Sequence, residues 1–87
     1  MEIKYAKKFE KRFKKLSPKM KKSVIDVVER FTKNPHDKVL CNHPLKGSLE
    51  GRRAMSVTGD MRIVFREYDD YVLVLMLDVG IHNQVYS

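Results

Sequence analysis

The 87-residue chain is 43% hydrophobic and 33% charged, which is typical of a folded domain and excludes a mostly disordered chain. It has no apolar run of about 18 residues, which excludes a membrane-spanning helix. The charged first residues argue against a signal peptide, and the single cysteine, Cys41, has no partner for an internal disulfide. We therefore expect one domain over residues 1–87 that works in the cytoplasm.

The net charge of +7 is concentrated at the N-terminal end of the chain. Residues 1–22 hold ten Lys or Arg and two Glu, a balance of +8, whereas residues 23–87 hold eight Lys or Arg and nine Asp or Glu. A basic block of this kind favours a polyanionic partner such as nucleic acid, the ribosome or an acidic protein. A solvated helix face is the alternative that a run of charge leaves open.

The first part of the chain predicts a short extended segment and then two helices. Residues 2–5 are expected to be extended. Apolar residues three or four positions apart predict amphipathic helices over 6–16 and 19–31. Ser17 can cap the second helix, and Pro35 disfavours helix at the residue before it. The two helices are expected to form a hairpin.

After a loop-like stretch at 34–51, the period of the apolar residues changes to two. Alternation over 53–57 and 61–67, and a run that is apolar on both faces over 71–79, predict three consecutive strands. Short turns between them make an antiparallel meander. The predicted fold class is therefore α+β, with the N-terminal strand and helical hairpin packed on one face of the sheet. The other face is left partly open and offers a surface for function.

Polar side chains at the strand ends and on the open face form a candidate site. Two histidines, a carboxylate and an arginine are the groups needed to cleave RNA without a metal. A base takes the 2′-hydroxyl proton, an acid protonates the leaving 5′-oxygen, and a cation stabilises charge on the phosphate. Histidine suits either proton transfer because its pKa lies near neutrality. The candidates are His43, Ser56, Asp60, Arg62, His82 and Tyr86.

Each candidate also has a purely structural interpretation. His43 precedes a proline in a loop, and Asp60 follows a glycine in a turn. An outward arginine such as Arg62 is ordinary in a strand, and Tyr86 can cover a sheet edge. Cys41 has no Cys or His partner at metal-ligand spacing, so we expect no metal site and no cofactor. The residues alone therefore indicate a phosphate-handling site and no more.

Three local motifs occur in order along the chain, "HPLKGSLEGRR", "GDMRIVFRE" and the closing "DVGIHNQVY". Together they resemble motifs of the RelE/ParE superfamily of toxins, in particular its YafQ-like branch. The resemblance implies a RelE-like fold and the toxin of a type II toxin–antitoxin pair. It also implies a ribosome-dependent mRNA endonuclease that arrests translation. The implied partners are the ribosome, mRNA and an acidic, RelB- or DinJ-like antitoxin in a hetero-oligomer.

Carried over residue by residue, the resemblance assigns roles to five candidates. It implies that His82 is the general acid and that His43 or Asp60 is the base. Arg62 matches an arginine that contacts the scissile phosphate in RelE-like relatives. Tyr86 is implied to stack on a base.

One departure from the pattern is Ser56, which stands where the branch has a second histidine and cannot act as acid or base. Two other functions therefore remain open. A ParE-like inhibitor of DNA gyrase acts by binding and needs no catalytic set, and a decayed toxin would still bind its antitoxin. The basic residues expected to bind RNA or the ribosome are Lys7, Lys8, Lys11, Lys14, Lys15, Arg52 and Arg53.

Overall fold

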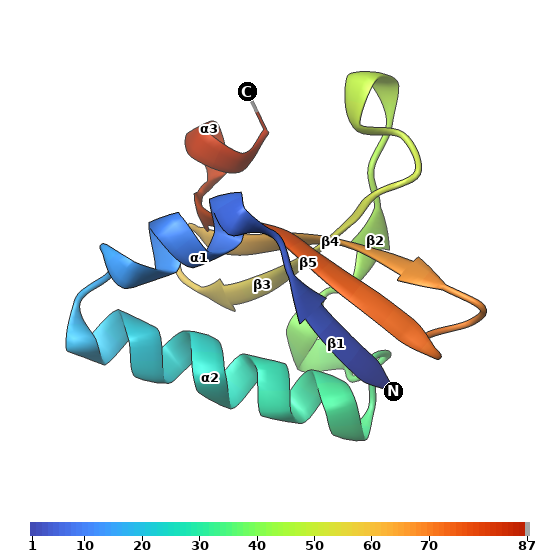
Figure 1. Cartoon of the computed structure of the whole chain (residues 1–87), viewed down its shortest axis with the longest axis horizontal. Coiled ribbons are helices and arrows are strands. Elements are labelled where there is room, and N and C mark those ends of the chain that lie inside the picture. Colours follow the sequence, from blue (N-terminus) through green and yellow to red (C-terminus); the bar gives the residue numbers. More distant parts are fainter. Residues whose placement is uncertain (87) are drawn as a thin grey trace.

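The computed structural model describes residues 1–86 and contains a five-stranded mixed sheet with helices packed around it (Figure 1). The strand order is β1-β5-β4-β3-β2, and the α+β class is confirmed. Two 3-10 turns, η1 (Lys38–Leu40) and η2 (Gly47–Leu49), flank β2. The other elements are β1 (Glu2–Tyr5), α1 (Lys7–Lys14), α2 (Pro18–Lys33), β2 (His43–Pro44), β3 (Arg53–Thr58), β4 (Met61–Tyr68), β5 (Leu73–Ile81) and α3 (His82–Val85).

Helix α2 begins and ends where the sequence predicts. Ser17 is its N-cap, with the side-chain oxygen accepting a hydrogen bond of 3.2 Å from a backbone N–H in the first turn. The helix ends two residues before Pro35. Val24 and Phe31 lie on its buried stripe, which faces the sheet above it (Figure 1). Among residues 1–86, no helix is long and apolar enough to cross a membrane.

The predicted meander is confirmed, because β4 pairs antiparallel with both β3 and β5. Two further strands extend it. β1 lies parallel to β5, and the two-residue β2 pairs with β3 inside the stretch that was expected to be a loop. Tyr71 was expected in the last strand, but its φ is 69° and β5 begins two residues later. This unfavourable backbone turns the Tyr71 ring against Phe31, at 5.9 Å between centroids.

The two helices of the hairpin lie in different places. α2 runs beneath one face of the sheet, whereas α1 lies at the sheet edge (Figure 1). β1 pairs with β5 over residues 73–76, and the backbone N–H of Ala6 then donates to the carbonyl of Met76 at 2.9 Å. Because β1 leads directly into α1, the helix packs beside the remaining part of β5.

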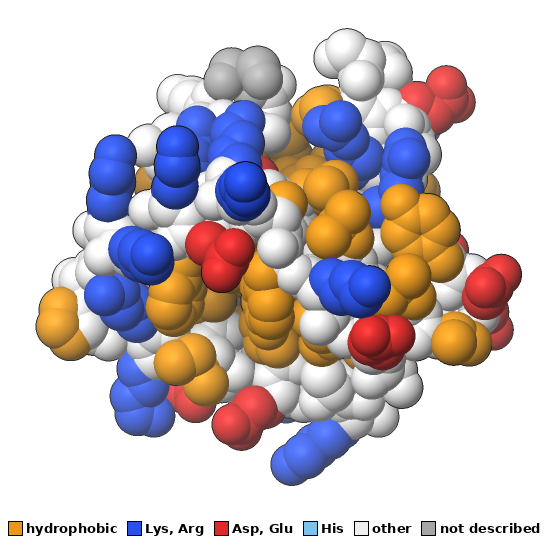
Figure 2. All heavy atoms as spheres, in the orientation of Figure 1, with side chains coloured by type: hydrophobic (Ala, Val, Ile, Leu, Met, Phe, Trp, Pro, Cys, Tyr) orange, Lys and Arg blue, Asp and Glu red, His pale blue; other side chains and the backbone are white. Residues whose placement is uncertain are grey.

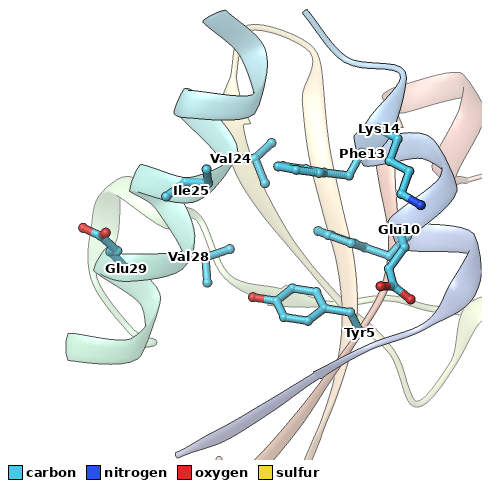
Figure 3. A pocket seen from close by; sticks show the side chains of 9 residues that line it. Tyr5, Glu10, Phe13, Lys14, Val24, Ile25, Val28 and Glu29 are labelled. Atoms are coloured by element: carbon cyan, nitrogen blue, oxygen red, sulfur yellow. The ribbon is translucent and has the colours of Figure 1, made fainter. Parts of the chain in front are cut away.

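An apolar groove of about 420 Å³ separates α1 from α2. Figure 3 shows the rings of Tyr5 and Phe13 facing Val24, Ile25 and Val28 across it. Tyr5 and Ile25 are 44% and 49% exposed. The hairpin therefore leaves apolar surface accessible to solvent between its two helices.

The face of the sheet away from α2 is less open than the alternation predicted. Ala54 and Val64 point to this face, yet they are 0% and 2% exposed. α3 packs against β4 and β5, and its Val85 is 5% exposed. α3, a helix that no sequence pattern predicted, covers part of this face (Figure 1).

The main core lies between α2 and the sheet. Phe31 of α2 meets Phe65 of β4 edge to face, with 5.0 Å between the ring centroids. The buried members of this core are Phe9, Val24, Phe31, Leu40, Met55, Met61, Ile63, Phe65, Val74, Met76 and Val79.

Phe31→Ala is expected to lower the free energy of unfolding by about 3–5 kcal/mol, because it removes a fully buried ring and leaves a cavity. Urea denaturation measures the change. The control is Val39→Ala, at a side chain that is 65% exposed, which should change stability by less than about 0.5 kcal/mol. A loss of under about 1 kcal/mol for Phe31→Ala would contradict this description of the core.

Candidate active site

Four candidate residues, Asp60, Arg62, His82 and Tyr86, come from one end of the sheet. Asp60 lies in the β3–β4 turn, and Arg62 lies near the start of β4. β5 ends beside this turn and continues directly into α3, which begins with His82. The backbone N–H of His82 donates to the carbonyl of Asp60 at 3.1 Å. This bond ties the C-terminal turn to the β3–β4 turn.

The rings of His82 and Tyr86 lie edge to face, with centroids 4.3 Å apart. α3 brings them together because residues four apart share one side of a helix. His82 is exposed, whereas Tyr86 is partly buried. Burial raises the pKa of the Tyr86 phenol above its ordinary value of 10.0, and the nearby charge of Arg62 acts in the opposite direction. The phenol is therefore un-ionised at neutral pH and lies near a guanidinium.

Among residues 1–86, the Arg62 guanidinium makes hydrogen bonds through one of its three nitrogens. Its Nη1 donates to the carbonyls of Gly59 and Met61, at 2.8 and 3.1 Å. Within residues 1–86, its Nε and Nη2 donors make no hydrogen bond. An arginine fork with free donors can bind a phosphate group.

His43 and Ser56 lie on the same face of the sheet as Arg62. Ser56 is directly opposite Arg62, and His43 is opposite Ala54, two residues from Ser56 along β3. Cross-strand partners and alternate residues share a face. A strand spacing of about 4.8 Å and a rise of about 3.4 Å per residue place the Cα of His43 about 12 Å from that of Arg62. The structure thus puts His43 on the far side of Arg62 from β5.

A hydrogen bond fixes the tautomer of His43. Its Nδ1 lies 2.8 Å from the carbonyl oxygen of Cys41. A carbonyl only accepts, so Nδ1 carries the hydrogen, and the neutral ring keeps its lone pair on Nε2. His43 is exposed, so its Nε2 is a proton acceptor within reach of a ligand.

The segment that leads into His43 is held by Asn42. Its Nδ2 donates to the carbonyl of Pro35 at 2.9 Å and to the Tyr71 hydroxyl at 3.0 Å. Its Oδ1 accepts a hydrogen bond from the Nε of Arg53 at 2.8 Å. Arg53, which was expected to contact RNA, is thus partly buried and engaged within the fold.

The other predicted basic residues are exposed, and Lys and Arg side chains gather over α1 (Figure 2). Lys8 is 63% exposed and lies 3.4 Å from Asp78. Among residues 1–86, the exposed predicted residues without an ion pair are Lys7, Lys11, Lys14, Lys15 and Arg52.

Asp78 is a residue that the sequence reasoning did not single out. Its side chain is 8% exposed, and Arg12 of α1 lies against it with an Nε–Oδ1 distance of 3.5 Å. The sequence signal that could have identified it is a carboxylate inside an otherwise apolar strand. A buried charge requires a partner, so such a residue predicts an ion pair.

A family model described as "Bacterial toxin of type II toxin-antitoxin system, YafQ" matches residues 1–87. Among solved structures, YafQ from E. coli strain BL21(DE3) has a TM-score of 0.80 at 23% identity, covering 99% of this chain and 98% of that one. The RelBE2 toxin–antitoxin complex from Mycobacterium tuberculosis gives 0.76 at 21% identity, covering 93% and 96%. The E. coli DinJ–YafQ complex gives 0.69 at 21% identity, covering 99% and 98%. These structures show the same fold, and no curated protein matches the sequence.

Proposed function

Because the chain belongs to the YafQ family of toxins of type II toxin–antitoxin systems, we propose that it is a ribosome-dependent endoribonuclease that cleaves mRNA by acid–base catalysis. One observation carries the proposal. Arg62 lies, in strand order, between the strand that bears His43 and the strand that leads to His82. A phosphate bound at Arg62 would have one imidazole on each side. In-line displacement at phosphorus requires the attacking and leaving oxygens on opposite sides of it.

In the proposed reaction, Nε2 of His43 takes the proton from the 2′-hydroxyl, and the 2′-oxygen attacks the adjacent phosphorus. The bond from phosphorus to the 5′-oxygen breaks, and His82 donates a proton to that oxygen. Arg62 stabilises the negative charge on the non-bridging oxygens. The products are a 2′,3′-cyclic phosphate, which can open to a 3′-phosphate, and a 5′-hydroxyl.

Two further assignments follow from position. Asp60 is bonded through its backbone to His82 and so lies on the acid side, which favours His43 as the base. The ring of Tyr86 packs against His82, where it can stack on a base next to the scissile phosphate. Ser56 lies opposite Arg62 and supplies no proton transfer.

The proposed partners follow from charge and from relatives. The balance of +8 on residues 1–22 favours ribosomal RNA during catalysis and an acidic antitoxin at rest. Two similar solved structures are toxin–antitoxin complexes, one of them of DinJ with YafQ. We propose a co-encoded antitoxin of the RelB or DinJ kind.

Induced expression followed by mapping of mRNA 5′ ends tests the function. Discrete cuts with 5′-hydroxyl ends are expected, and co-expression of the adjacent antitoxin should remove them. Translation arrest without discrete cuts would count against cleavage. Gyrase-dependent DNA breakage would instead support a ParE-like inhibitor.

The triple variant Lys11→Gln, Lys14→Gln, Lys15→Gln is expected to weaken ribosome binding while leaving the fold intact. These side chains are exposed, and the apolar stripe of α1 faces away from them. Each lost phosphate contact should reduce the slope of log affinity against log salt by about one. Binding measured across a salt series gives that slope.

The control is the triple variant Lys33→Gln, Lys38→Gln, Lys46→Gln, which removes the same charge from exposed positions outside α1. Equal losses for the two triple variants would mean that net charge matters and that α1 is only a solvated face.

A further inference from the structure

The short helix α3 depends on contacts outside itself. It has four residues, and a helix of that length is not stable alone. Val85 packs against the sheet, and the His82 N–H bonds to the β3–β4 turn. Both contacts hold α3 against the sheet, and Arg12 of α1 comes near its Gln84. If α3 carries the general acid, its direction decides where the imidazole points.

Arg12 and Gln84 approach each other beside Gly80, the last but one residue of β5. A Cβ placed on Gly80 would lie 2.6 Å from Oε1 of Gln84 and 3.3 Å from Nη1 of Arg12. Those two atoms are therefore within about 6 Å of each other, on the same side of the Gly80 backbone. Gln84 also caps α3, because its Oε1 accepts from the N–H of Ile81 at 3.1 Å.

Arg12 reaches this place because Asp78 holds it. The Nε of Arg12 lies 3.5 Å from the Asp78 carboxylate, and that carboxylate is also 3.4 Å from Lys8. The Nη1 of Arg12 is buried and, within residues 1–86, makes no hydrogen bond. Leaving a guanidinium nitrogen buried without an acceptor is costly.

The free energy of folding alone gives no reason to bury the ion pair of Arg12 and Asp78. A buried ion pair is often no more stabilising than apolar residues of similar volume. An ion pair does, however, fix two groups in one geometry. Because the guanidinium is planar and rigid, its remaining nitrogens are then fixed relative to a third group.

We propose that Arg12 is a positioning residue for the C-terminal turn. Held by Asp78 on one side, its guanidinium braces Gln84 on the other and thereby fixes the direction of α3. The His82 and Tyr86 rings are thus kept over the β3–β4 turn, next to Arg62 at the start of β4. The catalytic consequence rests on the proposed function, but the effect on α3 does not.

Arg12→Lys tests the proposal. Lysine keeps the charge beside Asp78 but lacks the second arm of the guanidinium. The maximal cleavage rate on programmed ribosomes is expected to fall about 10- to 100-fold, with the half-saturating ribosome concentration changed less than about twofold. In the free protein, protection of the His82 backbone N–H from hydrogen exchange should fall, because its bond to the Asp60 carbonyl joins α3 to the β3–β4 turn. A merely electrostatic or stabilising role would be rescued by lysine, and neither readout would change.

The matched control is Arg30→Lys, the same change in an exposed pair with Asp37 at 3.2 Å, which should leave both readouts as in the wild type. If Arg12→Lys does not fold, Gly80→Ala provides the second variant, since its Cβ meets both Gln84 and Arg12. Unchanged protection of the His82 N–H in the variant that folds would overturn the proposal. A wild type that does not cut mRNA would refute the proposed function, while protection of the His82 N–H would still test the role of Arg12.

Discussion

His82→Gln is expected to lower the rate of mRNA cleavage by about 10²–10⁴-fold, because glutamine keeps the size of the side chain but cannot donate the proton. Single-turnover cleavage on programmed ribosomes measures the rate. Stability should change little, since His82 is exposed and loses mainly its edge-to-face contact with Tyr86, worth about 0.5–1.5 kcal/mol. Toxicity should disappear, and antitoxin binding should remain.

The chain offers a closely matched control in His36→Gln. His36 is also exposed and also lies edge to face on a tyrosine, Tyr71, at 5.1 Å between centroids. The two variants lose the same kind of ring contact, but only one lies at the candidate site. Cleavage by the His82 variant at the wild-type rate would mean that the acid is elsewhere and that the C-terminal turn serves only the fold.

The elements that the sequence predicts are those with a repeating pattern. α2 follows from apolar residues three or four apart and from a capping serine, Ser17, before Pro18. The three strands of the meander follow from alternation or from an apolar run between turn residues. Each of these segments is long enough for the spacing of its apolar residues to distinguish a helix from a strand.

The missing elements have no such pattern. β2 is two residues long, and α3 is four, so neither completes a period. The parallel pairing of β1 with β5 joins residues about seventy positions apart along the chain, and no local signal specifies it. As a result, α1 was expected on a sheet face and instead lies at the sheet edge.

Some residues of the candidate site could be predicted from sequence motifs, and others could not. The family was predicted from three motifs, and the family model confirms it over residues 1–87. The motifs also predicted Asp60, Arg62 and His82 as site residues, and in the structure these three lie at one end of the sheet. The pairing of Asp78 with Arg12 depends on how far along β5 the helix α1 packs. That register is a tertiary property, so no motif contains it.

Arg62→Gln is expected to lower the cleavage rate by about 10²–10³-fold, the usual loss when one preorganised donor to a developing charge is removed. Glutamine is polar, but it carries no charge and no fork for a phosphate. The loss should appear in the maximal rate more than in ribosome affinity, because charge on the phosphate grows in the transition state.

Arg66→Gln separates this role from a general effect of charge. Arg66 lies on the same face of β4, about 14 Å along the strand, and its Nε donates to the Gly51 carbonyl at 3.2 Å. Both variants remove one positive charge from the same surface, so long-range attraction to RNA is weakened equally. A large loss for Arg62→Gln alone would place the scissile phosphate at the β3–β4 turn. Equal losses for both variants would mean that the sheet face binds RNA without a dedicated phosphate contact, and the in-line arrangement of His43 and His82 around Arg62 would lose its support.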